Sequence, residues 1–130
     1  MRKPVSKEGR KAFKTFQIHA GTYDFGINFC ITGDKEKIVR WVNWKLETDY
    51  VRPEDFDCLG KRIFRYGYCP IVWLPKIPKT PTEFGTAQHE IFHSVCDVMR
   101  WANIPLTNDT EEAYCHLIKH ITKKFLEQIK

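Results

Sequence analysis

Hydrophobic and polar residues alternate in two short runs near the start of the chain. Alternation with a period of two predicts strands that bury one face. Residues 21–24 (Gly-Thr-Tyr-Asp) separate the two runs and are typical of a turn. The apolar members of the runs are Phe16, Ile18 and Ala20, then Phe25, Ile27 and Phe29. We therefore predict a β-hairpin over residues 13–32.

The apolar spacing then changes to three and four residues, which predicts a helix. Asp34 is a favourable N-cap residue, and Arg52-Pro53 should end helical structure. The apolar stripe of this helix is Ile38, Trp41, Val42 and Leu46.

Residues 62–64 and 68–74, separated by Gly67, are rich in aromatic and β-branched residues and predict a second pair of strands.

Prolines at positions 75, 78 and 81 predict an irregular connector across residues 75–82. An amphipathic helix should follow from about Glu83 to Ala102, with Thr82 near its start and Asn103 at its end. Its expected buried residues are Phe84, Ala87, Ile91, Val95, Val98 and Ala102.

A last helix is predicted to end at about Gln128. Asn108 followed three residues later by Glu111 resembles a capping box at its start. Its apolar stripe is Tyr114, Leu117, Ile118, Ile121 and Phe125. The predicted strands and helices make one α+β domain of residues 12–130, preceded by a flexible basic N-terminus of residues 1–11.

Composition narrows the possible partners and the cellular compartment. The net charge is +5, but much of the excess lies at the two ends of the chain, so we do not expect a nucleic-acid partner. Five cysteines without a C-x-x-C pair argue against a disulfide framework and favour a reducing cytoplasm. No apolar run is long enough to cross a membrane, and no apolar core follows the basic N-terminus as in a signal peptide.

The motif H-E-x-x-H occurs at His89, Glu90 and His93, inside the helix predicted at 83–102. Residues four apart share one face of a helix, so His89 and His93 can offer ring nitrogens to one metal ion. Glu90 is rotated by about 100° from His89, which brings its carboxylate beside the open metal position. We predict His89 and His93 as zinc ligands and Glu90 as the general base on a metal-bound water. The alternative is a helix with two solvent-facing histidines.

A catalytic zinc typically has three protein ligands. Met99 lies six residues after His93, where an extended form of the motif has a third histidine. The acidic candidates are Glu111 and Glu112, 18 and 19 residues beyond His93. Glu111 lies nearer the apolar stripe of the last helix, whereas Glu112 points almost opposite its centre. The residues alone leave both candidates open.

The motif and its surroundings resemble the gluzincin metallopeptidases, which include the thermolysin-like enzymes. Residues 93–97 (His-Ser-Val-Cys-Asp) are similar to an H-x-V-x-D continuation in that family, and Glu112-Ala113 precedes a similar apolar pattern. Because a glutamate on the next helix completes the family's zinc site, the resemblance implies Glu112 as the third ligand. Residues 68–125 look still more like small metallopeptidase-like proteins encoded by bacteriophages, with a G-T-x-x-H-E-x-x-H helix and an E-E-A-Y helix. Residues 1–60 carry little of this likeness.

The resemblance implies a minimal zincin-like α+β domain, with a small β-sheet, a packing helix, the H-E-x-x-H helix and a C-terminal ligand helix. It implies zinc-dependent hydrolysis of peptide or protein substrates in the cytoplasm, the host cytoplasm if the protein is phage-encoded. The alternative is a zinc-stabilised, non-catalytic binding or regulatory module. A nucleobase deaminase is disfavoured because the P-C-x-x-C half of its signature is missing.

The resemblance also suggests supporting residues. His116 stands where thermolysin-like enzymes carry an aspartate that orients a ligand histidine, so it could play a similar part; the alternative is an ordinary polar residue of the helix. Asp97 could contact a ligand, although we favour a solvated side chain. Candidates to stabilise an oxyanion, each with a core or interface role as the favoured alternative, are Tyr66, Tyr68, Tyr114 and His120.

Tyr68–Leu74 is expected at the edge of the cleft, as in zincins, where an extended peptide can add as a further strand. Trp73 would then line the cleft, although ordinary core packing is the favoured role. Cys96 and Cys115 lie near the motif in sequence, and we expect buried small residues rather than metal ligands.

Overall fold

Four strands form one mixed sheet in the computed structural model, which describes residues 13–130. The predicted flexible segment 1–11 lies outside the described residues. The strands are β1 (Lys14–His19), β2 (Gly26–Ile31), β3 (Lys61–Ile63) and β4 (Ile71–Leu74). Their order is β1-β2-β4-β3, with β2 and β4 parallel and the two outer pairs antiparallel. The predicted hairpin and the second strand pair are both confirmed.

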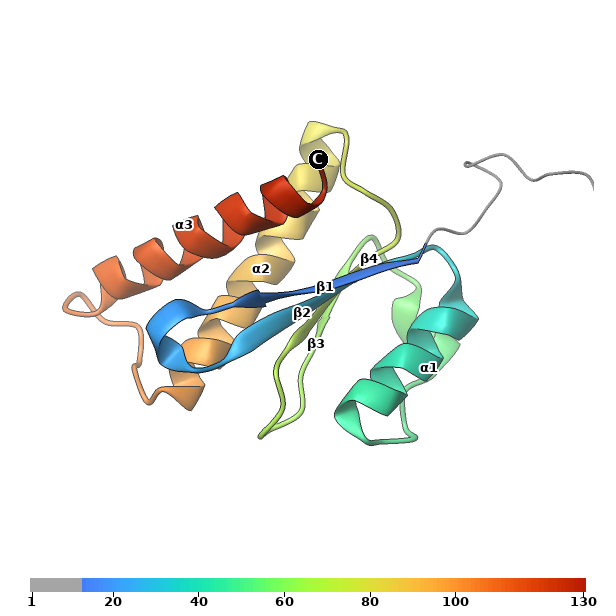
Figure 1. Cartoon of the computed structure of the whole chain (residues 1–130), viewed down its shortest axis with the longest axis horizontal. Coiled ribbons are helices and arrows are strands. Elements are labelled where there is room, and N and C mark those ends of the chain that lie inside the picture. Colours follow the sequence, from blue (N-terminus) through green and yellow to red (C-terminus); the bar gives the residue numbers. More distant parts are fainter. Residues whose placement is uncertain (1–12) are drawn as a thin grey trace, which may run out of the picture.

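The helices lie on both faces of this sheet (Figure 1). They are α1 (Lys35–Leu46) on one face, and α2 (Pro81–Trp101) and α3 (Glu111–Gln128) on the other. The chain also has two short 3-10 helices, η1 (Gly21–Tyr23) and η2 (Pro53–Phe56). The predicted α+β class is therefore confirmed. Among the described residues, no helix has the length and apolarity needed to cross a membrane.

Successive residues of β4 point into two separate hydrophobic cores. Val72 and Leu74 belong to the core beneath α2 and α3, whereas Ile71 and Trp73 belong to the core beneath α1. Every residue of β2 is buried as well, because β2 is a central strand with helices on both sides. The sheet thus forms the middle layer that holds α2 in a fixed orientation.

The starts of α1 and α2 agree with the predictions. Asp34 caps α1 as expected, accepting hydrogen bonds from the backbone N–H groups of Glu36 and Lys37. The next helix starts near Thr82 as predicted, with Pro81 as its first residue, and its cap is a capping box formed by Thr80 and Glu83. A proline is tolerated there since the first N–H of a helix has no intrahelical partner.

Glu83 also makes hydrogen bonds and an ion pair at the start of α2. Its carboxylate accepts hydrogen bonds from the backbone N–H groups of Lys79 and Thr80, and Lys76 Nζ lies 2.6 Å from its Oε2. Lys76 and the two backbone donors lower the pKa of Glu83 to about 2. This cap fixes the beginning of the helix that carries the metal-binding motif.

The capping box predicted at Asn108 and Glu111 is wrong. Thr110 is the N-cap residue of α3, and its hydroxyl bonds with Thr107 and the carbonyl of Pro105 instead of with the helix. The end of α3 at Gln128 agrees with the prediction.

Candidate metal centre

The middle of α2 brings His89, Glu90 and His93 together. One potential ligand atom from each residue lies within 4.8 Å of the others. The Nε2 atoms of His89 and His93 are 3.2 Å apart, and the two rings meet edge to face. Within residues 13–130 this is the one cluster of three His, Cys, Asp or Glu side chains close enough to share an ion. The convergence predicted from helical spacing is confirmed.

The distance between the two imidazole nitrogens fits a tetrahedral zinc ion. Zinc–nitrogen bonds of about 2.0–2.1 Å at a tetrahedral angle place two ligand nitrogens about 3.3 Å apart. The observed separation of 3.2 Å is close to this value. Both side chains reach the surface, so an ion could enter without any movement of α2.

Glu90 is the buried member of the cluster. Only 8% of its surface is exposed, and Oε1 lies 4.0 Å from His89 Nε2. Its other oxygen, Oε2, has no hydrogen-bond partner among the described residues. A buried carboxylate oxygen without a partner is costly. A cation held by the two histidines, or a water molecule beside it, would compensate this carboxylate.

Glu112 and Glu111 lie outside the cluster. Glu112 is exposed, and its Oε1 lies 3.3 Å from Nε2 of His116. Thr122 donates a hydrogen bond of 3.0 Å to the side chain of Gln88, the residue next to His89. Glu112 precedes Thr122 by ten residues, which corresponds to about 15 Å of helix. The first turn of α3 is thus well removed from the contact with Gln88, and Glu112 is not among the side chains within ligand distance of His89 and His93.

Asp97 lies one turn beyond His93 and is fully buried, so the expectation of a solvated side chain is wrong. Arg62 Nε on β3 lies 3.3 Å from Asp97 Oδ2, and Arg100 Nη1 lies 3.4 Å from Oδ1. Burial raises the pKa of Asp97, and the two arginines oppose that shift. The sequence alone does not indicate Arg62, because its partner lies 35 residues later in the chain. The ion pair ties β3 to the motif helix.

Several supporting candidates have contacts of their own. Tyr114 is buried and donates a hydrogen bond of 2.6 Å to the carbonyl of Ile104. The hydroxyl of Tyr68 lies 2.6 Å from Oε2 of Glu47, and Nε2 of His120 lies 3.0 Å from the carbonyl of His19. Tyr66 is exposed near the ring of Trp101. The structure thus supports a core role for Tyr114 alone and does not bring any of the four side chains into the metal-binding cluster.

The strand expected at the cleft edge is an interior strand. β4 lies between β2 and β3, so β3 is the outer strand on the side of Asp97. Trp73 is buried in the core, where its Nε1 donates a hydrogen bond of 2.9 Å to the carbonyl of Thr32. The assignment of Tyr68–Leu74 to the edge is therefore wrong, and the core role of Trp73 is confirmed.

Neither cysteine near the motif joins the cluster. Cys96 is partly buried, and burial raises the pKa of its thiol. Cys115 is exposed, contrary to the expectation of a buried residue. All five cysteines are free thiols.

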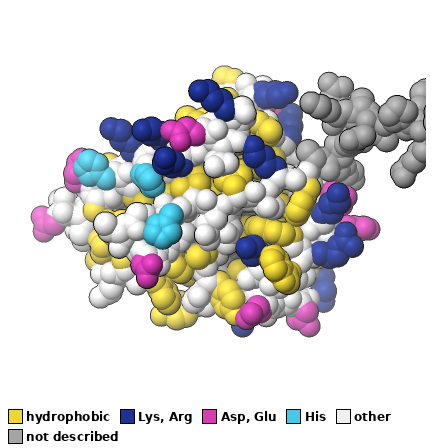
Figure 2. Space-filling view, in the orientation of Figure 1, with side chains coloured by type: hydrophobic (Ala, Val, Ile, Leu, Met, Phe, Trp, Pro, Cys, Tyr) yellow, Lys and Arg dark blue, Asp and Glu magenta, His cyan; other side chains and the backbone are white. Residues whose placement is uncertain are grey.

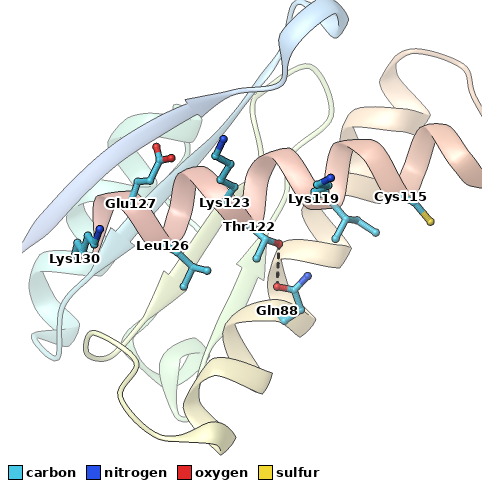
Figure 3. Close-up of a pocket in the computed structure, with 9 residues that line it drawn as sticks. Gln88, Cys115, Lys119, Thr122, Lys123, Leu126, Glu127 and Lys130 are labelled. Atoms are coloured by element: carbon cyan, nitrogen blue, oxygen red, sulfur yellow. Dashed lines mark hydrogen bonds between the residues drawn. The ribbon is translucent and has the colours of Figure 1, made fainter.

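A surface groove of about 670 Å³ runs along α3 and reaches α2 at Gln88 (Figure 3). Cys115, Ile118 and Leu126 supply apolar contacts, and lysine side chains dominate its charge. The lysines are Lys119, Lys123 and Lys130, and the acid in the lining is Glu127. The three members of the metal-binding cluster do not line this groove.

No protein-family model matches the chain, and no match is found among curated proteins or solved structures. The case for a function therefore rests on the geometry of His89, Glu90 and His93 and on the chemistry of their donor atoms.

Proposed function

We propose that the protein is a zinc-dependent hydrolase of peptide bonds built on a minimal zincin-like domain. The observation that carries the proposal is the meeting of two imidazole nitrogens, 3.2 Å apart, beside a buried carboxylate on one helix. Two neutral imidazoles are ligands that suit zinc, and a carboxylate beside them can act as the base on a zinc-bound water. The unpartnered Oε2 of Glu90 supports a cation or a reactive water at this place.

His89 and His93 would hold the ion through their Nε2 atoms. A bound zinc ion would polarise the scissile carbonyl and lower the pKa of water towards about 7. Glu90 accepts a proton from the attacking water and returns it to the leaving amine. The burial of Glu90 keeps this carboxylate in place beside the histidines and limits its contact with bulk water.

Glu112 remains our proposed third ligand, by resemblance to gluzincins. In the present arrangement it is exposed and outside the cluster, so ligation would require a different placement of the first turn of α3 against α2.

Glu90→Gln tests the catalytic part of the proposal. The amide keeps the size of the side chain but cannot accept the proton, so we expect cleavage of a mixed peptide library by the zinc-loaded protein to fall by at least 100-fold. Glu54→Gln, an exposed carboxylate on η2, is the matched control and should cleave at the parent rate. Equal cleavage by the parent and Glu90→Gln would refute the assigned base.

The groove on α3 favours the second candidate, a zinc-stabilised binding module. Its apolar contacts and lysines could hold a protein partner without any turnover. Stoichiometric zinc in the parent protein, with no cleavage of the library above the rate of Glu90→Gln, would favour this candidate over hydrolysis.

A further inference from the structure

The outward face of α1 carries aromatic and basic side chains together. Phe13, Lys37, Arg40, Trp41 and Trp44 line a surface hollow of about 370 Å³. Figure 2 shows hydrophobic and basic side chains side by side on the surface in the region where Figure 1 places α1. This face lies across the sheet from α2 and its metal-binding cluster.

Trp44 and Phe13 contribute little to the core, whereas Trp41 is partly buried and packs against the core beneath α1. The buried stripe of α1 consists of Ile38, Val42 and Leu46. Trp44 lies on a different side of the helix from this stripe and is 70% exposed. Phe13, just before β1, is 43% exposed. Large aromatic side chains that are left exposed together are typical of a binding surface.

Cations surround the aromatic rings of this face. Lys37 Nζ lies 5.9 Å from the ring centre of Phe13, and Lys45 Nζ lies 5.1 Å from that of Trp44. α1 has four basic residues and one acid, Glu36, which does not line the hollow. The face therefore combines ring surfaces for stacking with positive charge.

We propose that this face binds single-stranded nucleic acid, with bases stacked on Trp44, Trp41 and Phe13. The nearby Lys37, Arg40 and Lys45 would contact phosphates. Stacking platforms within a positively charged surface are the common means of binding single strands without sequence preference. The rings stay accessible to a flexible strand, whereas the bases of a duplex are already stacked on each other.

The charge of the adjoining segment supports an anionic ligand. Residues 1–12 contain five basic residues and one acid, and they connect directly to Phe13. Their charge has the same sign as that of the α1 face and would add to the attraction of phosphates.

A membrane surface fits this face less well. Helices that lie in a membrane interface bury a broad apolar side rich in aliphatic residues. The hollow on α1 is lined by three aromatic and two basic residues and by no aliphatic one. The prediction against nucleic acid rests on the charge at the chain ends, whereas this face forms only when Phe13 comes beside α1.

Fluorescence anisotropy with a labelled oligothymidylate of about 15 nucleotides tests the proposal on the whole chain. We expect Trp44→Ala to weaken binding by about tenfold, because stacking on one ring is lost. Trp44→Phe should retain most of the affinity. Titration of the parent protein should also quench tryptophan fluorescence, and Trp44→Phe should reduce that change.

Two pairs of charge-reversal variants distinguish binding at this face from general attraction of the oligonucleotide to a basic protein. Lys37→Glu with Arg40→Glu should abolish binding, whereas Lys119→Glu with Lys123→Glu on α3 should lower it only slightly. The proposal would be overturned if both pairs of variants lost the same affinity or if Trp44→Ala had no effect. It would also be overturned if the parent protein did not bind the oligonucleotide. Binding to vesicles of phosphatidylcholine and phosphatidylserine in place of the oligonucleotide would assign the face to membranes and overturn it too. His89→Ala should bind the oligonucleotide normally, so this result is independent of the metal centre.

Discussion

Asp97 shows how one buried charge links the motif helix to the sheet. Its carboxylate is fully buried between Arg62 of β3 and Arg100 of α2. Removing one partner of a buried pair leaves the other charge uncompensated. We expect Asp97→Ala to lower the free energy of unfolding by about 3 kcal/mol, as measured by urea denaturation. Asp109→Ala, at an exposed site, should have little effect, and equal stability of both variants would argue against this link.

Residues of the candidate centre differ in how well the sequence predicts them. His89, Glu90 and His93 belong to one helix, so their spacing alone places them together. Glu112 belongs to another helix, and its distance from the histidines depends on how α3 crosses α2. Asp97 was misjudged for the same reason, since its burial depends on Arg62, which arrives from a distant strand.

At the scale of single elements, the start of α2 depends on a charged cap. The pKa of Glu83 is held at about 2, so its ionised form stabilises the fold at neutral pH. That contribution is complete above the ordinary value of 4.5 and is lost as the pH falls towards 2. We expect Glu83→Gln to lower the melting temperature by a few degrees at pH 7, with the difference from the parent vanishing near pH 2.

Glu127→Gln provides the control for this melting experiment. Glu127 makes a surface ion pair with Lys124 at 3.6 Å, which contributes little to stability. Its variant should melt close to the parent at every pH. A Glu83→Gln difference that stays constant down to pH 2 would contradict a charge-based cap.

The sequence predicts the strands and helices better than it predicts which of them lie next to each other. Periodicity indicated the hairpin and all three long helices, because each pattern lies within one element. Local patterns did not identify the residues at the N-cap positions of α2 and α3, which are Thr80 and Thr110. The order of strands in the sheet is set by contacts between distant segments, so the interior position of β4 could not be predicted from its own residues.

For the whole molecule, the sheet separates two surfaces with different chemistry. α2 carries the histidine and glutamate cluster on one side, and α1 carries the aromatic and basic face on the other. A polymer bound at α1 would not need to displace a ligand of the metal centre. The two proposals can therefore fail or succeed independently.

Zinc content tests the central claim most directly. Proteins purified after equilibration with zinc and dialysis are analysed by elemental mass spectrometry. We expect about one zinc ion per chain in the parent protein. Glu90→Gln should retain it, because Glu90 stands beside the ion rather than holding it. Glu112→Ala should lose zinc and Glu111→Ala should retain it if Glu112 is the third ligand, and the reverse would reassign that ligand to Glu111.

His89→Ala and His93→Ala are the deciding variants of this measurement, and His19→Ala on β1 and His120→Ala on α3 are their matched controls. The proposed centre predicts that zinc is lost from the first two variants and retained by the controls. Stoichiometric zinc in both His89→Ala and His93→Ala would contradict the metal centre.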